Sequence, residues 1–482
     1  MLSHEWKLTA SHFPDSKMLT SPRLKSLLLA GTFLLHSLSY SHATAPVCGP
    51  GATVPIGGGK DGIEIDKAWS GTTVTFDAIS RGGKIYVGYY DADRWLTVAQ
   101  LEPASGVVCR ARISSQFAGW DSHNSVALAF DSAGRLQVAA NMHASPLVYG
   151  SANTPDTVSG ITLTPMTGHD ERKVTYPNFV NGADGTLYFS YRNGVSGNGE
   201  WFVNTRYGEY WKRTLDVPIF SSTWNGLPTN AYPTPFKVFQ DGYVHLAIVW
   251  RRSPDVASNY AITYARTRDF VHWEDHLGHQ IEPPITPGNS DVVDTVGEGN
   301  GLLNSARVGL TENGSPVIAY TKYGPDGKNV MVLASPGSNG WRRSIIATAS
   351  SQTVLKGMGT VPNLPAFGEL DLSHDHVGGI NIVFPGEPRK RIWFNVDTLQ
   401  PADTPKLQTP LVTTRPLDTS PPPGLFNERR TVLGVREDRA SKKAAGSIVY
   451  FSQEVNRDRA RDCTVAQPTA CNPPPSPLIF VP

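Results

Sequence analysis

The chain has 482 residues, of which 39% are hydrophobic and 18% charged, a balance that supports a large folded core. Its formal net charge of +1 excludes a global field that would attract nucleic acid or a membrane surface. Any preference for an anionic ligand must therefore come from a local cluster of basic side chains. Glycine (45) and proline (38) are abundant, which favours many short strands joined by turns over long helices.

The N-terminal region has the layout of a secretory signal peptide. Two basic residues precede an apolar run, Leu27 to Leu38, and small residues follow it up to Ala43. We assign residues 1–45 to the signal peptide and regard residues 1–17 as a spurious extension. The run is shorter than the roughly 20 apolar residues of a spanning helix, so a membrane anchor is the weaker alternative. These features predict a secreted or periplasmic protein that does not bind membranes.

The four cysteines fit an oxidising compartment. Cys463 and Cys471 are close enough in sequence to close a small loop, which would leave Cys48 to pair with Cys109. Four cysteines allow three pairings, and the sequence leaves all three open. None of the cysteines lies in a Cys-x-x-Cys motif, so they indicate neither a metal site nor redox chemistry.

One pattern recurs along the chain: a turn that contains glycine, followed by a strand with alternating apolar residues. Seven of these units predict an all-β, seven-bladed β-propeller, a single domain that covers residues 46–482. A long β-sandwich or a solenoid is the alternative. Residues 401–423 are rich in proline and threonine and are expected to form an extended crossing before the last blade. The leading glycines are 51 to 72 residues apart: Gly83, Gly134, Gly185, Gly242, Gly314, Gly379 and Gly446.

The second repeat predicts a pair of histidines. Residues equidistant from the centre of a hairpin face each other across its two strands. The turn is centred near residue 133, and His123 and His143 are each ten residues from that centre. We therefore expect the two imidazoles to be neighbours at the open end of this hairpin. Two surface histidines with only local hydrogen bonds are the alternative interpretation.

The next two repeats place further polar side chains at the same end of their hairpins. Tyr176 and Arg192 are each eight residues from a turn centred near residue 184, which predicts that they face each other. The following turn places Tyr232 opposite Arg251 or Trp250. Successive blades present the same hairpin end to the same face, so all these side chains are expected to line one rim. The alternatives are core aromatics for the tyrosines and surface ion pairs for the arginines.

Two further segments stand out. Gly194–Gly199 matches no phosphate loop, because no helix is expected after it, and is expected to be a tight rim loop that lets a ligand approach the backbone. His272, His276 and His279 lie in one turn-rich segment and give only a weak metal-binding signal. We predict no metal at the functional site and no required cofactor, and we leave a structural metal ion open.

Phenol, imidazole and guanidinium groups together make a cationic pocket that can also move protons. In a uronate, an arginine that neutralises the carboxylate makes the neighbouring C5 proton removable. A tyrosine or histidine then acts as the base, and another one protonates the leaving oxygen. Hydrolysis usually needs two carboxylates beside the bond, and none of these hairpin-end positions is a carboxylate. The pattern therefore favours β-elimination.

Several motifs carry a family resemblance: Asp121-Ser-His-Asn124, Asn141-Met-His143, Thr175-Tyr-Pro177, Tyr191-Arg-Asn-Gly194, Val249-Trp-Arg251 and Ala265-Arg-Thr-Arg-Asp-Phe-Val-His-Trp273. In combination, from about residue 70 to 350, they resemble the BNR-4 repeat family, which includes propeller ulvan lyases and rhamnose–glucuronate lyases. The resemblance implies a lyase with four catalytic residues: His123, His143, Tyr176 and Arg192. We assign substrate binding to three further residues: Asn124, Tyr232 and Arg251. For Arg251, the resemblance also implies this role.

Together these observations predict a monomeric lyase that cleaves an acidic polysaccharide at a 4-linked glucuronate, with rhamnose as the neighbouring sugar. Arg192 is expected to neutralise the carboxylate and to lower the pKa of Tyr176 through its charge. His143 is expected to complete the acid–base pair, while His123 orients it or binds substrate. The alternatives are a glycoside hydrolase on the same propeller, of rhamnosidase or sialidase type, and a non-catalytic glycan-binding propeller.

Overall fold

The computed structural model describes residues 42–374, 376–404, 420–438 and 446–482, which are mostly strands and turns. The one helix among these residues is a single 3-10 turn, η1 (Val256–Ser258). No described helix has the length and hydrophobicity needed to span a lipid bilayer. Most of the predicted signal peptide (1–41) and the middle of the predicted crossing (405–419) lie outside the described residues.

Three sheets are simple meanders, in which four consecutive strands pair antiparallel in chain order. Sheet 3 contains β8 (Ala127–Phe130), β9 (Arg135–Ala139), β10 (Tyr149–Pro155) and β11 (Ile161–Leu163). Sheet 4 contains β12 (Val174–Asn181), β13 (Leu187–Val195), β14 (Asn198–Tyr207) and β15 (Tyr210–Arg213). Sheet 6 contains β24 (Arg307–Leu310), β25 (Pro316–Tyr323), β26 (Asn329–Gly337) and β27 (Gly340–Thr348).

Two further sheets are less regular, and a short hairpin stands apart from them. Sheet 5 contains β18 (Asn230–Pro233), β19 (Val244–Arg251), β20 (Asn259–Thr267), β21 (Trp273–Glu274), β22 (Gln280–Ile281) and β23 (Asp291–Thr295). Sheet 7 contains β28 (Ala366–Phe367), β29 (Asp371–His374), β30 (Val377–Val383) and β31 (Lys390–Asn395). The hairpin joins β16 (Thr223–Trp224) and β17 (Leu227–Pro228).

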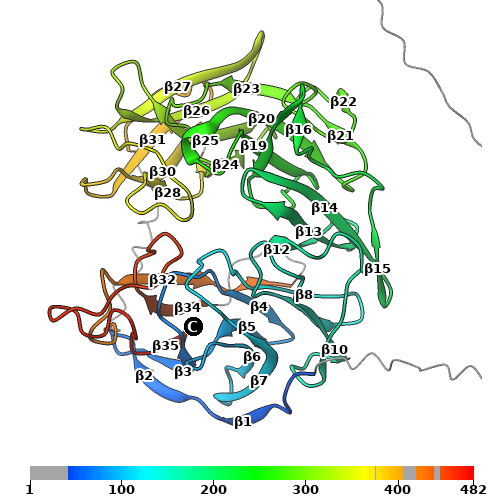
Figure 1. Ribbon diagram of the computed structural model, residues 1–482, viewed down its shortest axis with the longest axis vertical. Coiled ribbons are helices and arrows are strands. Elements are labelled where there is room, and N and C mark those ends of the chain that lie inside the picture. Colours follow the sequence, from blue (N-terminus) through cyan, green and yellow to red (C-terminus); the bar gives the residue numbers. More distant parts are fainter. Residues whose placement is uncertain (1–41, 375, 405–419, 439–445) are drawn as a thin grey trace, which may run out of the picture. The chain divides into compact units, whose positions relative to one another are not determined.

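The remaining two sheets combine strands from both ends of the described chain. Sheet 1 contains β2 (Ala52–Pro55), β3 (Asp61–Ala68), β32 (Arg429–Gly434), β34 (Ser447–Ser452) and β35 (Ser476–Val481). Sheet 2 contains β1 (Val47–Pro50), β4 (Asp77–Arg81), β5 (Lys84–Tyr90), β6 (Trp95–Glu102), β7 (Val107–Gln116) and β33 (Arg436–Glu437). Strand β3 pairs with β35, so the last strand completes the sheet that contains one of the first (Figure 1).

The glycine-led turns of the sequence recur in the structure with one exception. Six of the seven leading glycines lie one or two residues before a strand, and their φ values are between 77° and 134°. Glycine adopts this left-handed region without strain because it has no Cβ. The prediction for Gly379 is wrong, because this glycine lies inside β30. His376, at φ 52°, takes the left-handed position directly before that strand.

The predicted pairing of the two histidines is confirmed. Ala127 of β8 lies opposite Ala139 of β9, and continuing that register past the strand ends brings His123 level with His143. Their ring centroids are 4.3 Å apart and their planes differ by 24°.

The other two predicted pairings are displaced. Thr175, not Tyr176, lies opposite Arg192, because the register of β12 shifts between Thr175 and Asn178. Tyr232 lies opposite Val249, and the cross-strand partner of Arg251 is Asn230. Counting from a turn assumes a regular ladder, and a bulge or a longer turn moves the register by one or two residues.

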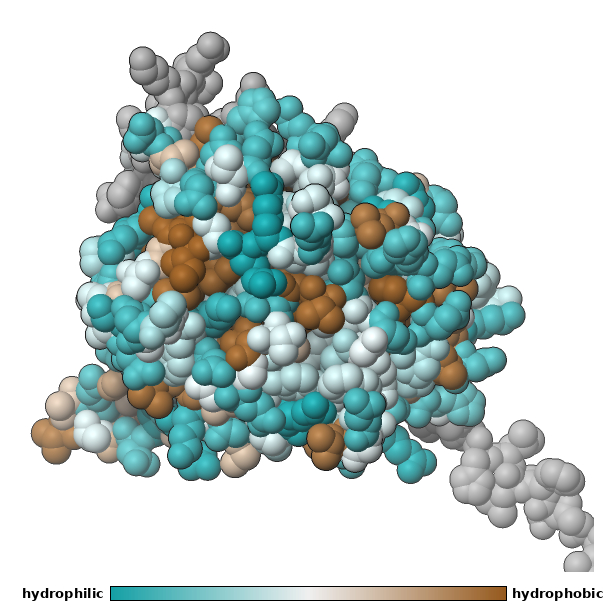
Figure 2. All heavy atoms as spheres, turned by 90° about the horizontal axis from the view of Figure 1, so that it is seen from above, coloured by the Kyte–Doolittle hydropathy of each residue, from teal (hydrophilic) through white to brown (hydrophobic). Residues whose placement is uncertain are grey.

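The apolar faces of neighbouring sheets pack against each other. One continuous core cluster includes Leu478 of sheet 1, Val98 of sheet 2 and Leu136 of sheet 3, all fully buried. At Gly88 of sheet 2, an added Cβ would lie 2.6 Å from Val126, so the absent side chain allows the close approach of the next sheet. On the face shown in Figure 2, the hydrophobic surface is divided into small patches by hydrophilic side chains.

One disulfide joins two paired strands of sheet 2, and the other closes a loop near the C-terminus. Cys48 of β1 pairs with Cys109 of β7, and Cys463 pairs with Cys471 in the C-terminal loop. Of the three pairings that the sequence allows, the structure therefore contains the one suggested by the proximity of Cys463 and Cys471. Disulfides of this kind persist in oxidising compartments.

Candidate active site

A cavity of about 400 Å³ is lined by residues of sheets 3 to 7 and their connections. Its polar wall comprises His123, His143, Tyr176, Arg192, Ser196, Tyr232 and Arg251. Its apolar wall comprises Val256, Leu303, Val361, Leu364, Pro365 and Phe367. The rest of the lining is Asn304, Ser305, Arg307, Gly359, Thr360 and Ala366. No aspartate or glutamate is among these lining residues.

The two histidines of the polar wall share one carboxylate. Asp121 Oδ1 lies 2.7 Å from Nδ1 of His123, and Asp121 Oδ2 contacts Nδ1 of His143. Burial opposes the ionisation of Asp121, but hydrogen bonds from both histidines outweigh it and hold its pKa well below the usual range. An ionised carboxylate only accepts hydrogen bonds, so both Nδ1 atoms carry a hydrogen. Nε2 is then the atom of each neutral ring that can take up a proton.

Tyr176 lies within the irregular stretch of β12 at φ 59°, a conformation that non-glycine residues rarely adopt. Its ring stacks on Trp201 with centroids 5.8 Å apart, and it forms an edge-to-face contact with His123, with centroids 5.9 Å apart. Burial raises the pKa of Tyr176 and outweighs the lowering effect of the Arg192 charge. The charge of Arg192 does lower this pKa, as expected, but the effect of burial is larger, so Tyr176 is a protonated phenol at neutral pH.

Arg192 is the most deeply buried cation of the polar wall, with 1% of its surface exposed. Its guanidinium lies 4.9 Å from the ring centroid of Tyr176, and Nη2 donates to Thr175 Oγ1 at 3.3 Å. Among the described residues, no hydrogen-bond acceptor meets its Nε or Nη1 atoms. Buried donors without a partner are costly, so an acceptor that enters the cavity could form hydrogen bonds with these nitrogens. Gly199 leaves the room that its side chain needs, since a Cβ there would lie 2.9 Å from Arg192 Cδ.

Tyr232 and Arg251 form a second buried pair on the polar wall. Arg251 Nη1 donates to the Tyr232 hydroxyl at 3.0 Å, and Ser196 Oγ lies 3.1 Å from the same hydroxyl. Burial opposes ionisation of this phenol, but the charges of Arg251 and Arg192 and the two hydrogen bonds lower the pKa of Tyr232. The site therefore contains two phenols with opposite pKa shifts.

The remaining predicted residues have different surroundings. Asn124 is buried and does not line the cavity; its amide donates to the Asp121 carbonyl, and its own carbonyl accepts from Tyr90. The predicted rim loop Gly194–Gly199 does reach the cavity, through Ser196.

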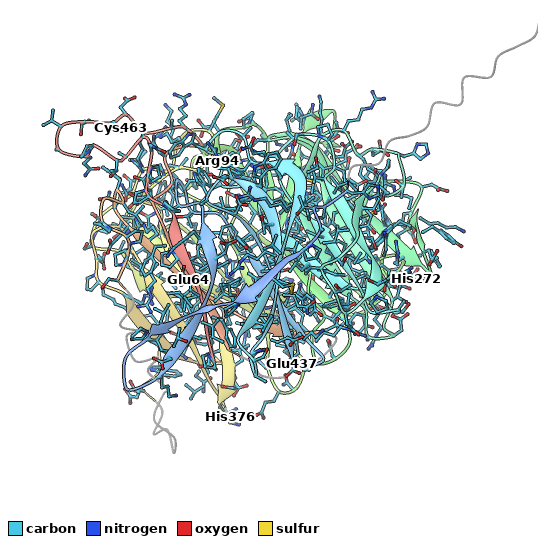
Figure 3. All side chains as sticks on the ribbon, turned by 90° about the horizontal axis from the view of Figure 1, so that it is seen from below. Glu64, Arg94, His272, His376, Glu437 and Cys463 are labelled. Carbon is cyan, nitrogen blue, oxygen red and sulfur yellow. A yellow bond between two sulfur atoms is a disulfide. The ribbon has the colours of Figure 1, made fainter. Side chains whose placement is uncertain are left out.

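His272, His276 and His279 do not share a site. Their Nδ1 atoms pair with three different carboxylates, at distances of 2.6 to 2.9 Å: Asp269, Asp291 and Asp275. His272 lies at the surface of the molecule (Figure 3). The weak metal-binding signal of this segment is thus explained by three local ion pairs.

Among the described residues, one group could hold a metal ion: Asp121, His123 and His143, whose donor atoms lie within 4.8 Å of one another. Both carboxylate oxygens of Asp121 already engage the two Nδ1 atoms, so an ion between them would replace those hydrogen bonds. The arrangement as it stands holds both imidazoles by hydrogen bonds to one carboxylate.

Sequence reasoning missed Asp121 and the whole apolar wall. Asp121 stands two residues before His123, a spacing that lets its carboxylate also accept the backbone N–H of His123, at 2.9 Å. That Asp-x-His spacing was the available signal. The apolar wall from Val361 to Phe367 has no such signal, because it is brought to the site only by the arrangement of the sheets.

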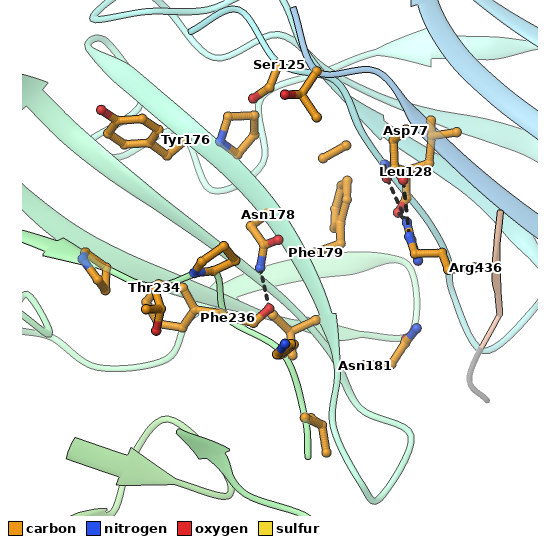
Figure 4. Close-up of a pocket in the computed structure, with 18 of the residues that line it drawn as sticks. Asp77, Ser125, Leu128, Tyr176, Asn178, Phe179, Asn181, Thr234, Phe236 and Arg436 are labelled. Atoms are coloured by element: carbon orange, nitrogen blue, oxygen red, sulfur yellow. Dashed lines mark hydrogen bonds and ion pairs between the residues drawn. The ribbon is translucent and has the colours of Figure 1, made fainter. Parts of the chain in front are cut away.

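A larger cavity of about 980 Å³ adjoins the site and shares Tyr176, Tyr232 and Asn304 with it. Strands β4, β8, β12 and β18 contribute to its lining. In Figure 4, Asn178 donates to the Phe236 carbonyl and Arg436 pairs with Asp77, which crosslinks neighbouring walls of this cavity. The two cavities are therefore separated by a shared wall that includes Tyr176, Tyr232 and Asn304.

The fold and the site together define a class of protein. Its members are all-β chains of repeated antiparallel sheets, with a pocket that is cationic and rich in phenols. The sequence model described as "BNR repeat-containing family member" matches residues 84–349. This match covers more than half of the chain, and the protein belongs to that family. No functionally curated protein matches the chain significantly.

Solved structures of polysaccharide lyases have a similar fold. A PL25 ulvan lyase bound to -[GlcA(1-4)Rha3S]- gives a TM-score of 0.55 at 10% identity, over 83% of this chain and 93% of that chain. A second structure described as a PL25 ulvan lyase gives a TM-score of 0.52 at 11% identity, with the same coverage. The polysaccharide lyase Uly1 gives 0.51 at 14% identity, over 92% of this chain and 98% of that chain.

Proposed function

We propose that this protein is a polysaccharide lyase that cleaves a chain at a 4-linked glucuronate by β-elimination. The observation that carries the proposal is the composition of the pocket: a buried arginine with two unpartnered nitrogens, two phenols and two imidazoles, without a lining carboxylate. The names of the structurally similar lyases support a glucuronate- and rhamnose-containing glycan of ulvan type as the substrate.

The uronate carboxylate is the acceptor that we assign to Arg192. A guanidinium offers parallel N–H donors to a planar carboxylate from Nε with Nη2 or from Nη1 with Nη2. In Arg192, Nε and Nη1 have no acceptor among the described residues, and Nη2 has a second N–H besides the one it donates to Thr175. Neutralising the carboxylate charge weakens the C5–H bond, since the carbanion that develops at C5 delocalises into the carboxylate. Arg251 and Tyr232 adjoin the same position and bind the sugar.

The acid and base follow from the protonation states. His143 presents a free Nε2 because Asp121 engages its Nδ1, so it takes the C5 proton. Tyr176 remains protonated and donates its hydroxyl proton to the leaving O4 oxygen as the C4–O4 bond breaks. The electron pair of the C5–H bond becomes the C4–C5 double bond, and no water is consumed. His123 stacks on His143 and orients it.

We also propose that the seven sheets are seven blades of one β-propeller domain spanning residues 46–482. Seven sheets of four or more described strands, two of which contain strands from both ends of the described chain, support this arrangement. An experimental structure with fewer than six blades would contradict it. The disulfides support the proposed secreted or periplasmic location.

One assay tests the function against its rivals. Purified protein is incubated with ulvan, and both ultraviolet absorbance and new reducing ends are followed, with the Tyr176→Phe variant as control. A lyase produces both signals, because its product carries a C4–C5 double bond conjugated to the carboxylate. A glycoside hydrolase produces reducing ends without the absorbance, and a glycan-binding protein produces neither. The arginines supply the positive charge, so EDTA should leave the rate unchanged.

A further inference from the structure

The C-terminal segment reaches the candidate site through one carboxylate. Asp458 Oδ2 accepts the backbone N–H of Thr360 at 2.9 Å. Its Oδ1 accepts from the backbone N–H and the hydroxyl of Ser122, at 3.4 and 3.3 Å. Thr360 lines the cavity, and Ser122 directly precedes His123, so Asp458 connects two loops that form the pocket. The side chain of Asp458 is only 14% exposed.

Asp458 also approaches the histidine pair itself. Its Oδ1 lies 3.9 Å from Nδ1 of His123, the atom that Asp121 engages at 2.7 Å. The His123 ring is stacked on His143 and forms an edge-to-face contact with Tyr176. A shift of the loop that carries His123 would therefore be transmitted to both groups proposed to move protons.

The backbone around Asp458 is held in an unusual conformation. Arg457 and Asp458 have φ values of 52° and 62°, a region that L-residues avoid. Gly359 packs directly against this turn, since a Cβ there would lie 2.9 Å from Asp458 Oδ2. Non-glycine residues in such conformations persist only where their surroundings determine them, and they are concentrated at functional sites.

We infer that Asp458 is a positioning residue that fixes His123, and through it His143 and Tyr176, relative to the pocket wall at Thr360. The inference rests on the proposed function, because that function defines the reaction in which His143 and Tyr176 move protons. Asp458 lies 336 residues from Ser122 in sequence and outside the family match at 84–349. Asp458 precedes the loop closed by the Cys463–Cys471 disulfide, which Figure 3 marks at Cys463, so the C-terminal segment before that loop contributes to the site.

The kinetic test uses Asp458→Ala and Asp458→Glu on the full chain with ulvan as substrate. Asp458→Ala should lower kcat about tenfold or more, because small misplacements of acid–base groups are costly, while KM changes less than about twofold. The uronate contacts at Arg192 and Arg251 are untouched, so the loss should appear in kcat. Asp458→Glu, which keeps the carboxylate, should recover part of it. Asp462→Asn, a substitution at an exposed position of the same segment, is the control and should behave as the parent.

A second readout does not depend on activity. Nitrogen-15 NMR of the imidazoles should show His123 with a protonated Nδ1 in the parent, and Asp458→Ala should shift the His123 and His143 signals but not those of His276. If the parent cleaves no ulvan and the signals shift, the proposed function fails and the positioning role stands. If the parent cleaves and Asp458→Ala keeps both its kcat and the His123 signals, even with a lower Tm, Asp458 is a structural anchor and the inference is overturned.

Discussion

The two walls of the pocket differ in chemistry and in how they are held. The polar wall comes from His123 to Arg251, inside the family match, and its side chains are tied to one another by hydrogen bonds and ring contacts. Much of the apolar wall, from Val361 to Phe367, comes from a segment beyond residue 349. It contributes packing surface and carries no titratable group.

This difference suggests separate tasks for the two walls, with the reaction assigned to the polar wall and the fit of the substrate to the apolar wall. Groups that move protons or bear charge must be oriented within a few tenths of an ångström, which requires a network such as Asp121 with its two histidines. An apolar surface recognises a sugar face by contact area alone and tolerates small changes of shape. Substitutions in the polar wall should therefore lower turnover, and substitutions in the apolar wall should weaken binding.

The largest effect is expected at Arg192. Arg192→Lys keeps the charge but loses the planar pair of donors, so kcat/KM on ulvan should fall by more than about a hundredfold. The matched control is Arg206→Lys, a change at an arginine that pairs with Asp131 outside the pocket. Comparable kcat/KM values for the parent and Arg192→Lys would show that a point charge suffices and that the carboxylate lies elsewhere.

Loss of either proton-moving group should be nearly as severe. His143→Ala and Tyr176→Phe should each reduce kcat by about a hundredfold or more, the usual contribution of a general acid or base. Binding of ulvan by the Tyr176→Phe protein, measured by calorimetry, should persist because Arg192 and Arg251 remain. Near-normal turnover in both variants would place the active site on other hairpins.

The apolar wall should respond on a smaller scale and in a different parameter. Leu364→Ala removes contact surface only, so KM should rise by up to about fivefold, the effect of losing about 1 kcal/mol, with kcat unchanged. Val354→Ala, at a side chain that is 70% exposed and does not line the cavity, is the control. A fall in kcat for Leu364→Ala as large as that of Tyr176→Phe would remove the distinction between the walls.

The smallest effect concerns stability in acid. The pKa of Asp121 is lower in the folded than in the unfolded chain. The contribution of its carboxylate to the free energy of unfolding is therefore fully present above about pH 4 and is lost as the pH falls further. Between pH 5 and pH 3, the Tm of the Asp121→Asn protein should therefore fall by less than the Tm of the parent. Asp93→Asn, at a carboxylate that is 65% exposed, serves as the comparison. An equal acid sensitivity of parent and Asp121→Asn would mean that the histidine cluster does not stabilise the charge.

Much of the fold and part of the site could be predicted from local patterns. Alternation of apolar residues and glycine turns depend on neighbouring residues only, so the repeated strands and their turns could be identified. His123 and His143 could be paired because β8 and β9 form a regular ladder around one short turn. Tyr176 was not aligned with Arg192 correctly, because the register of β12 shifts between Thr175 and Asn178. Pro177, which has no N–H to donate to a ladder, was the available signal.

The sequence by itself determined the all-β class, the repeated units and the residue types that give the pocket its charge. Tertiary structure alone decided which phenol is the more acidic, because the pKa values of Tyr176 and Tyr232 depend on burial and on the distances to Arg192 and Arg251. It also decided that Asp121 is shared by two histidines and that Asp458 approaches His123 from the other end of the chain. Electrostatic interactions depend on separation in space, and separation along the chain carries little information about it.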